Sequence, residues 1–201
     1  MLFDDLSFEL QAGQARWVQG ENGAGTTSLL RLLCGLSQPD EGEVRWRGVP
    51  LARQRESFHA ELLHIGHASG VKDDLSAWEN VVFSAALAGA TCRRDEAHAA
   101  LEQLGLAPAV FDLPARLLSQ GQRKRVALAR LGLSTRHPLW VLDEPLSALD
   151  ASTLERLQNL LGRHLSRGGL LVCTTHQALD LPGHTVQTLN LSALESSCSA
   201  H

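Results

Sequence analysis

A glycine-rich stretch near the start of the chain has residue types and spacing that suit phosphate binding. Residues 20–27 read Gly-Glu-Asn-Gly-Ala-Gly-Thr-Thr. Phosphate-binding loops have two glycines separated by four residues, followed by lysine and then serine or threonine. Their glycines let backbone N–H groups surround phosphate oxygens, and the following helix directs its positive end at the same point. The candidate nucleotide-binding residues are Gly20, Glu21, Asn22, Gly23, Ala24, Gly25, Thr26, Thr27 and Ser28.

The loop departs from this pattern at Thr26, which stands where the lysine is expected. That lysine reaches the β- and γ-phosphates with charge-assisted hydrogen bonds, each worth about 1.5–3 kcal/mol. Threonine is uncharged and too short to reach, so we expect ATP binding to be weaker by roughly tenfold to a hundredfold and turnover to be slow. Three explanations remain open: an altered copy of an active enzyme, a true low-activity subunit, or rescue by another basic residue.

Three groups of residues downstream could act on a nucleotide. Leu118-Ser119-Gln120-Gly121-Gln122 stands at the expected start of a helix, where a serine hydroxyl and backbone N–H groups form a second anion site. Asp143 and Glu144 follow an apolar run, where one carboxylate can hold Mg²⁺ through water and its neighbour can act on the attacking water. His176 follows a second apolar run and a pair of threonines.

Strands and helices alternate along the chain and place these residues at their ends. The expected strands are 16–19, 43–46, 62–65, 139–142 and 170–173, of which the last two are apolar enough to be fully buried. The expected helices are 28–33, one capped by Ser76 and Glu79, 95–104, one that starts near Ser119, and 154–164. The alternation predicts one domain with a parallel α/β core, 1–66 and 136–201, interrupted by a helical subdomain at about 67–135.

Composition limits the class of protein. The 201 residues suffice for one domain with a sizeable interior, and the net charge of −4 gives no reason to expect nucleic acid. No apolar run approaches the roughly 18 residues needed to span a bilayer, and the acidic start is unlike a signal peptide. The cysteines are scattered without a CxxC motif, so we expect free thiols in a reducing cytosol.

Some residue groups have a structural interpretation that we favour. His59, His64 and His67 lack the helical spacing of metal ligands, so surface or core positions are favoured over a metal or haem site. The basic run at residues 123–125 is expected on a solvated helix face rather than in a nucleic-acid patch. Trp140 is expected in the core.

The order of these motifs resembles that of the nucleotide-binding subunit of an ABC transporter, over nearly the whole chain. Within that family, several stretches are similar to the haem-exporter ATPase subunit of bacterial cytochrome c maturation, the CcmA type. They are residues 6–8, 28–33, 65–67, 75–80 and 174–177. The resemblance implies a P-loop NTPase core of the RecA-like kind with an ABC-type helical subdomain.

Site roles follow from the resemblance, position by position. It implies that Thr27 and Asp143 bind Mg²⁺, that Glu144 is the general base, and that His176 contacts the γ-phosphate of ATP. The signature residues would cover ATP bound to a second subunit, and Asp150 of the D-loop would connect the two sites. These signature residues are Leu118, Ser119, Gln120, Gly121 and Gln122. Hydrolysis then requires a homodimer, because neither subunit owns a complete site.

The chain departs from the family pattern at two further places. It begins late, so the first strand and the aromatic side chain that stacks on adenine are expected to be missing. Phe3 and Phe8 are candidate substitutes for that aromatic, with a core position favoured for Phe8. The loop position that normally offers glutamine to Mg²⁺ and to the membrane partner falls on His67. Because magnesium prefers oxygen ligands, we expect His67 to act in coupling rather than as a metal ligand.

The resemblance implies a peripheral ATPase on the cytoplasmic face of the bacterial inner membrane, without nucleic-acid partners and without membrane insertion of its own. It would use ATP and Mg²⁺ beneath membrane-spanning subunits of the cytochrome c maturation complex. Two alternatives remain open. One is a subunit whose bound nucleotide stabilises assembly without hydrolysis, and the other is an ABC exporter ATPase for another cargo.

Overall fold

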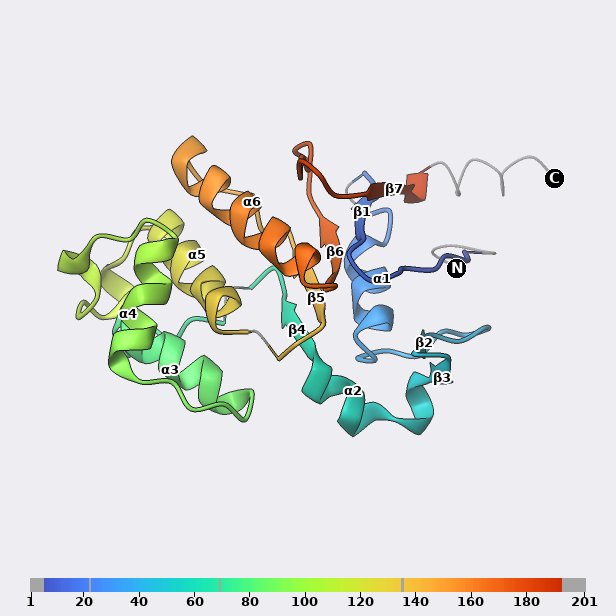
Figure 1. The fold of residues 1–201 in the computed structure, drawn as a ribbon, viewed down its shortest axis with the longest axis horizontal. Coiled ribbons are helices and arrows are strands. Elements are labelled where there is room, and N and C mark those ends of the chain that lie inside the picture. Colours follow the sequence, from blue (N-terminus) through green and yellow to red (C-terminus); the bar gives the residue numbers. More distant parts are fainter. Residues whose placement is uncertain (1–5, 22, 69, 135, 193–201) are drawn as a thin grey trace.

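The fold is built around one parallel sheet (Figure 1). The structure is a computed structural model, and it describes residues 6–21, 23–68, 70–134 and 136–192. The strands are β1 (Ala15–Gln19), β4 (Leu62–Ile65), β5 (Leu139–Asp143), β6 (Leu170–Thr174) and β7 (Val186–Asn190). They lie in the order β4-β5-β6-β1-β7, and each neighbouring pair is parallel. The carboxyl ends of these strands therefore meet at one edge of the sheet.

Both faces of the sheet are covered, which explains the continuous apolar runs of its central strands. Along β5, Trp140 and Leu142 face one buried cluster, whereas Leu139 and Val141 face another. The first cluster includes residues of α3 (Ala77–Leu87), α4 (Arg94–Gln103), α5 (Gln120–Ala129) and α6 (Ala151–Ser166). The second includes residues of α1 (Thr26–Leu33) and α2 (Arg55–Glu61). The sheet thus lies between two helical layers, as the alternation of strands and helices predicts.

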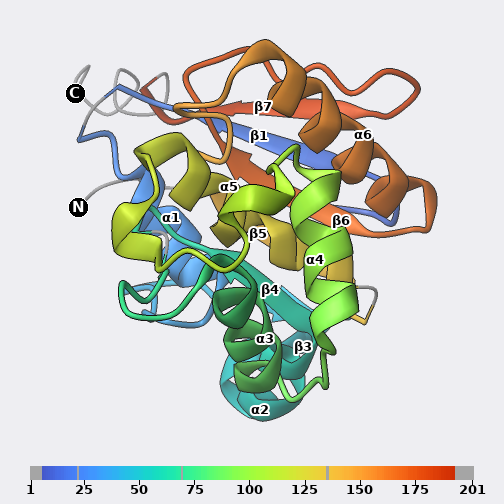
Figure 2. The same cartoon turned by 90° about the vertical axis from the view of Figure 1, so that its left-hand side faces the viewer.

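Helices α3, α4 and α5 pack against one another and form a lobe, which lies to one side of the sheet in Figure 1 and in front of it in Figure 2. A capping box starts α3, as the sequence predicts: Ser76 Oγ accepts from the backbone N–H of Glu79 at 3.3 Å, and a Glu79 carboxylate oxygen accepts from the backbone N–H of Ser76 at 2.8 Å. This capping box satisfies backbone N–H groups that have no partner inside the helix. The boundaries of a separate helical subdomain, at about 67 and 135, stay a prediction.

The remaining elements are short. β2 (Arg45–Trp46) and β3 (Val49–Pro50) form an antiparallel hairpin apart from the main sheet. Short 3-10 turns occupy Leu51–Arg53, Pro108–Val110, Ala115–Leu117 and Arg130–Leu133.

The amino-terminal segment differs from one expectation. Phe8 is half-buried and belongs to neither buried cluster, so the expected core position is wrong. Its ring instead lies against the guanidinium group of Arg16, at 4.9 Å from the ring centroid. β1 is the first strand in the described part of the chain. Phe3 and Asn22 lie outside that part, so the expectations that rest on Phe3 and on a missing first strand stay untested.

Candidate functional site

The loop at residues 20–27 joins the carboxyl end of β1 to the amino end of α1, the strand–loop–helix arrangement that phosphate binding requires. Gly23 and Gly25 have positive φ angles of 96° and 84°, which side chains of L-residues disfavour. The backbone N–H of Ala24 donates to the carbonyl of Glu21 at 3.0 Å and closes the turn. The first N–H groups of α1 have no partner within the helix and are available to an anion.

Thr26 is the first residue of α1 and is half-buried beside Gly20. A Cβ atom on Gly20 would lie 2.9 Å from Ala24 Cβ and 3.0 Å from the methyl carbon of Thr26. The methyl group of Thr26 therefore packs against its own loop, and the loop closes too tightly for a side chain at position 20. Positive potential at this point comes from loop N–H groups and the helix end rather than from an ammonium group.

Asp143 ends β5 with a carboxylate that is nearly inaccessible to solvent, at 5% exposure. Thr174 donates to its Oδ1 at 2.7 Å, and Thr27 donates to its Oδ2 at 3.5 Å. Asp143 thus connects the helix that follows the phosphate loop with β6, the strand between β5 and β1. A carboxylate and a hydroxyl are the oxygen ligands that Mg²⁺ takes, so the residues at this point fit a magnesium site.

Glu144 has a φ angle of 49°, in the left-handed region that residues other than glycine rarely adopt. Its backbone N–H donates to Thr174 at both the carbonyl oxygen (3.1 Å) and Oγ1 (3.0 Å). Its carbonyl accepts from Ser147 Oγ at 2.8 Å. The side chain lies toward His176, with Oε1 at 3.6 Å from Nε2. Hydrogen bonds therefore support a strained backbone beside Asp143, and such strain concentrates at functional sites.

Residues at the start of α5 cap the helix, and some of them are also exposed to solvent. Ser119 Oγ accepts from the backbone N–H of Gln122 at 3.2 Å, and Gln122 Oε1 accepts from the backbone N–H of Ser119 at 2.8 Å. Ser119 and Gln120 are exposed, whereas Leu118 is buried beneath them. The residue at 121 must be small, because a Cβ atom there would lie 3.1 Å from the carbonyl oxygen of Ala148.

Asp150 begins α6 as its N-cap. Its Oδ1 accepts from the backbone N–H of Thr153 and from the hydroxyl of Ser152, each at 2.8 Å. The hydrogen bond from Thr153, followed by that from Ser152, lowers the pKa of Asp150 to about 2. Sequence analysis missed this local role, although an aspartate before an amphipathic helix is the usual signal. A role for Asp150 between two subunits stays a prediction.

Comparisons with known proteins agree with this geometry. The sequence pattern of the family described as ABC transporter matches residues 3–147. Over 191 residues, the chain is 50% identical to the cytochrome c biogenesis ATP-binding export protein CcmA of Nitrosomonas europaea, covering 95% of this chain and 89% of that protein. Over 193 residues, it is 48% identical to the protein of the same name from Escherichia coli, with 95% and 89% covered. The chain belongs to the ABC transporter family.

Solved structures of ABC proteins have the same fold as this chain. An ATP-binding ABC transporter protein from Pyrococcus furiosus superposes with a TM-score of 0.80 at 23% identity, covering 96% of this chain and 91% of that one. A dimeric ATP-binding cassette in a post-hydrolysis state, bound to ADP and Pi, gives 0.76 at 25% identity, with 88% and 80% covered. The P-loop NTPase fold expected from the sequence is confirmed. Among the described residues of this ABC protein, no helix has the length and apolarity to cross a membrane.

The basic run at residues 123–125 of this ABC protein is not a solvated face, so that expectation is wrong. All three side chains are half-buried. Arg123 pairs with Asp73, and Arg125 donates to the carbonyl of Gly105 at 3.2 Å.

Lys124, between these arginines, lies near the candidate site, although the sequence prediction did not include it. Burial lowers the pKa of its ammonium group, whereas the carboxylates of Asp143 and Glu144 act in the opposite direction. A cation therefore lies within electrostatic reach of both acids, and it comes from α5 rather than from the phosphate loop. No local signal marks Lys124, because its position near these acids depends on how α5 packs against the sheet.

The histidines after α1 occupy ordinary positions. His59 Nε2 lies 3.0 Å from the carbonyl oxygen of Cys34, His64 is half-buried in β4, and His67 is exposed in a bend after that strand. In the ranges that the structure describes, no group of three or more His, Cys, Asp or Glu side chains is arranged to hold a metal ion. A coupling role for His67 stays a prediction.

Proposed function

We propose that this chain is the ATP-hydrolysing subunit of an ABC exporter that serves cytochrome c biogenesis. The arrangement of Thr27, Asp143 and Glu144 at the carboxyl edge of the sheet carries the proposal. The 50% identity to a CcmA export protein supports the cellular process.

The chemistry assigned to these residues is hydrolysis of the terminal phosphoanhydride of ATP. Backbone N–H groups of the loop bind the phosphates, and Thr27 and Asp143 hold Mg²⁺. When bound, this ion neutralises charge on the phosphoryl oxygens. Glu144 accepts a proton from the attacking water, and hydrogen bonds of its backbone hold this residue in place next to Asp143. His176, which is exposed and lies 3.6 Å from Glu144, would contact the γ-phosphate.

We propose that the active form is a homodimer. The start of α5 presents Ser119 and Gln120 to solvent, where they can cover ATP bound to a second copy. One of the similar solved structures is a dimeric cassette, which supports this arrangement. Each complete site would then combine the loop of one subunit with the α5 tip of the other.

The proposals for the remaining partners, the cargo and the location rest on the resemblance to proteins of the CcmA type. We propose membrane-spanning subunits of the cytochrome c maturation complex as partners, haem as the cargo, and the cytoplasmic face of the inner membrane as the location. The chain itself would supply energy without contacting cargo.

Complementation tests the assignment to this process. The chain would be expressed in a bacterium that lacks its own CcmA protein, and covalently bound haem in c-type cytochromes would be measured. We expect the wild-type chain to restore these cytochromes and Glu144→Gln to leave them absent. Restoration by Glu144→Gln would contradict a role for hydrolysis, and an inactive wild-type chain that is well expressed would favour an exporter for another cargo.

A second candidate function is supported by Thr26. Without the lysine, bound nucleotide could stabilise assembly of the complex without being hydrolysed. Phosphate release from the purified complex separates the two functions, because hydrolysis requires release above that of Glu144→Gln, whereas the assembly role requires equal release from both.

A further inference from the structure

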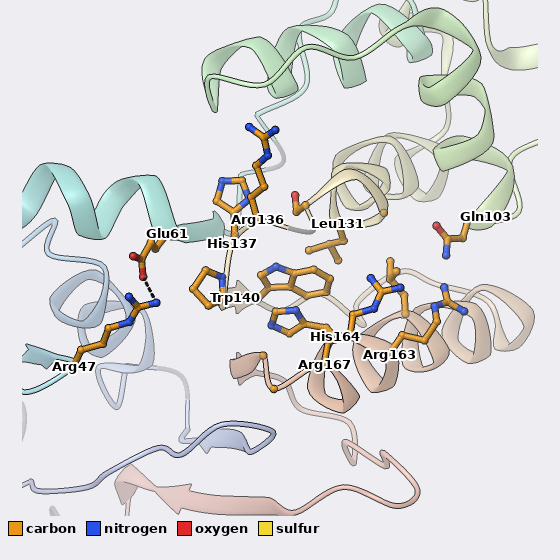
Figure 3. A pocket seen from close by; sticks show the side chains of 16 residues that line it. Arg47, Glu61, Gln103, Leu131, Arg136, His137, Trp140, Arg163, His164 and Arg167 are labelled. Atoms are coloured by element: carbon orange, nitrogen blue, oxygen red, sulfur yellow. Dashed lines mark ion pairs between the residues drawn. The ribbon is translucent and has the colours of Figure 1, made fainter.

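A basic pocket lies at the amino end of the sheet, opposite the candidate nucleotide site (Figure 3). Its volume is about 530 Å³. Its walls come from the turn between β2 and β3, the loop before β5, and the end of α6. None of the candidate nucleotide-site residues lines it. The pocket is therefore a separate feature of the fold, and it has no part in the hydrolysis proposed above.

Positive charge gathers around the pocket. Arg136, Arg163 and Arg167 are exposed there, and within the described ranges none of them is paired with a carboxylate. A fourth arginine, Arg47, pairs with Glu61 at 2.9 Å (Figure 3). The chain as a whole has a net charge of −4, so this local excess runs against the overall balance. A surface of this kind raises the local concentration of anions.

Two stacked rings form the centre of the pocket. The rings of Trp140 and His164 have centroids 3.8 Å apart and planes only 6° from parallel (Figure 3). His164 Nε2 lies 3.1 Å from the carbonyl oxygen of Leu170, and this hydrogen bond holds the His164 ring in place. The His164 ring also occupies the space that a side chain at Gly169 would need. The centre of the pocket is therefore closely packed and held in one geometry.

Two buried nitrogen atoms of the pocket have no hydrogen-bond partner among the described residues: the indole nitrogen of Trp140 and Nδ1 of His137. Trp140 is only 3% exposed. Buried polar groups are nearly always satisfied, and those that are not need an explanation such as a ligand or ordered water. Because an indole N–H can only donate, the partner that Trp140 lacks is an acceptor such as an anionic oxygen.

A purely structural role explains part of this charge. Arg163 and Arg167 lie near the end of α6, where the helix dipole favours positive groups. Backbone groups already satisfy terminal carbonyls of this helix: Gly168 N–H donates to Leu165 at 2.9 Å, and Gly169 N–H donates to His164 at 3.0 Å. The guanidinium groups are therefore not needed as caps. The dipole also leaves the indole N–H of Trp140 and the charge of Arg136 unexplained.

We propose that this pocket binds a small phosphate-bearing anion. Guanidinium groups match phosphate oxygens with paired hydrogen bonds, and the three exposed arginines of the pocket supply such groups. The volume lies within the range of about 300–1,000 Å³ typical of small-molecule sites. The site takes its ligand at the edge of the sheet away from the phosphate loop.

Nuclear magnetic resonance of the tryptophan indole groups tests the proposal, with pyrophosphate as the probe. Trp140 reports on the pocket, and Trp140→Phe assigns its signal. Trp17 reports on the other edge, because its indole N–H donates to the carbonyl of Thr175 at 2.9 Å, next to the candidate nucleotide site. The double variant Arg163→Gln, Arg167→Gln removes two charges from the pocket. Its matched control, Arg53→Gln with Arg55→Gln, removes two exposed charges elsewhere.

We expect the Trp140 signal to shift and saturate below about 1 mM pyrophosphate, with binding weakened at least ~10-fold in the pocket variant and unchanged in the control. A shift confined to Trp17 would place pyrophosphate at the nucleotide loop and overturn the proposal. If both double variants weakened the Trp140 shift equally, the binding would be nonspecific attraction to positive charge, and the proposal would be overturned. All four arginines in these variants are exposed, so circular dichroism is expected to show an unchanged fold.

Discussion

At the scale of single residues, we expect Thr26 to limit how tightly this site can hold a triphosphate. Its methyl group packs against Gly20, and no ammonium group extends from the loop itself. We expect Thr26→Lys to raise ATP affinity and turnover by roughly 10- to 100-fold, because the lysine adds charge-assisted hydrogen bonds to the phosphates. Calorimetric titration with Mg·ATP and a phosphate-release assay would measure the two quantities.

The control for Thr26→Lys is the double variant that also carries Glu144→Gln. It is expected to keep the gain in affinity and lose turnover. Unchanged affinity in Thr26→Lys would show that the missing lysine does not limit phosphate binding by this loop.

Lys124 brings a positive charge to the acids of the site by another route. Burial lowers the pKa of its ammonium group, whereas Asp143 and Glu144 favour the charged form. We expect Lys124→Gln to lower turnover by about tenfold, since the site would lose a cation near its two acids. Arg123→Gln is the matched control, because Arg123 lies on the same helix and pairs with Asp73. Equal turnover in the two variants would remove Lys124 from the site.

His64 makes stability depend on pH. Its burial, followed by the positive charge of Arg130, lowers its pKa, whereas Asp143 acts in the opposite direction. As the pH falls below the ordinary value of about 6.5, the unfolded chain takes up a proton that the folded chain resists. The stabilisation by neutral His64 is therefore complete above that pH and declines below it. We expect Tm to fall between pH 7.5 and 5.5, and to fall less in His64→Gln.

The pKa values of His137 and His164 are also lowered, first of all by burial. Some pH dependence should therefore remain in His64→Gln. A drop in Tm as large as that of the wild type would show that His64 contributes nothing to it.

At the scale of elements, two glycines near the end of α6 should respond to alanine in opposite ways. A Cβ atom at Gly169 would collide with the His164 ring, so we expect Gly169→Ala to destabilise the fold by about 1–3 kcal/mol. At Gly162, inside α6, the same change meets only ordinary contact with His184 at 3.5 Å. Gly162→Ala should therefore stabilise by up to ~1 kcal/mol. Urea unfolding of both variants measures the difference, and equal effects would contradict this packing.

The elements that the sequence predicted are those with a strong local signal. The apolar runs of β5 and β6 and the capping box at Ser76 stand out in any window. α2 and β7 were missed for a physical reason. α2 buries only Phe58 among its seven residues, and β7, at the sheet edge, buries none of its five side chains. Such elements form because a neighbouring strand or helix accepts them, and a single sequence does not display that neighbour.

In the candidate site, too, residues with a local sequence signal were predicted, and those that depend on packing were missed. Motif spacing predicted Asp143, Glu144 and the loop as site residues, because these residues lie at the ends of predictable strands. Lys124 and the N-cap role of Asp150 were missed, the first because it depends on packing between α5 and the sheet. The pocket around Trp140 has no sequence signal either, since its walls come from distant parts of the chain.

At the scale of the whole molecule, the proposed dimer should depend on nucleotide. We expect Glu144→Gln to sediment as a dimer with Mg·ATP and as a monomer with ADP, because bound ATP joins the loop of one copy to the α5 tip of the other. Gln120→Arg, added to that variant, should abolish the dimer, since Gln120 is exposed and takes no part in the helix cap. Dimers that form equally well with ADP or with Gln120→Arg would require a different interface.

The position of Lys124 on α5 has a consequence for such a dimer. This helix starts at the surface that would meet the nucleotide of the neighbouring copy, and Lys124 lies little more than one turn further along, near the acids of its own copy. The single helix α5 would thus lie near the nucleotide sites of both copies. A small tilt of this helix would alter the surroundings of two triphosphates at once, so the two sites would change conformation together.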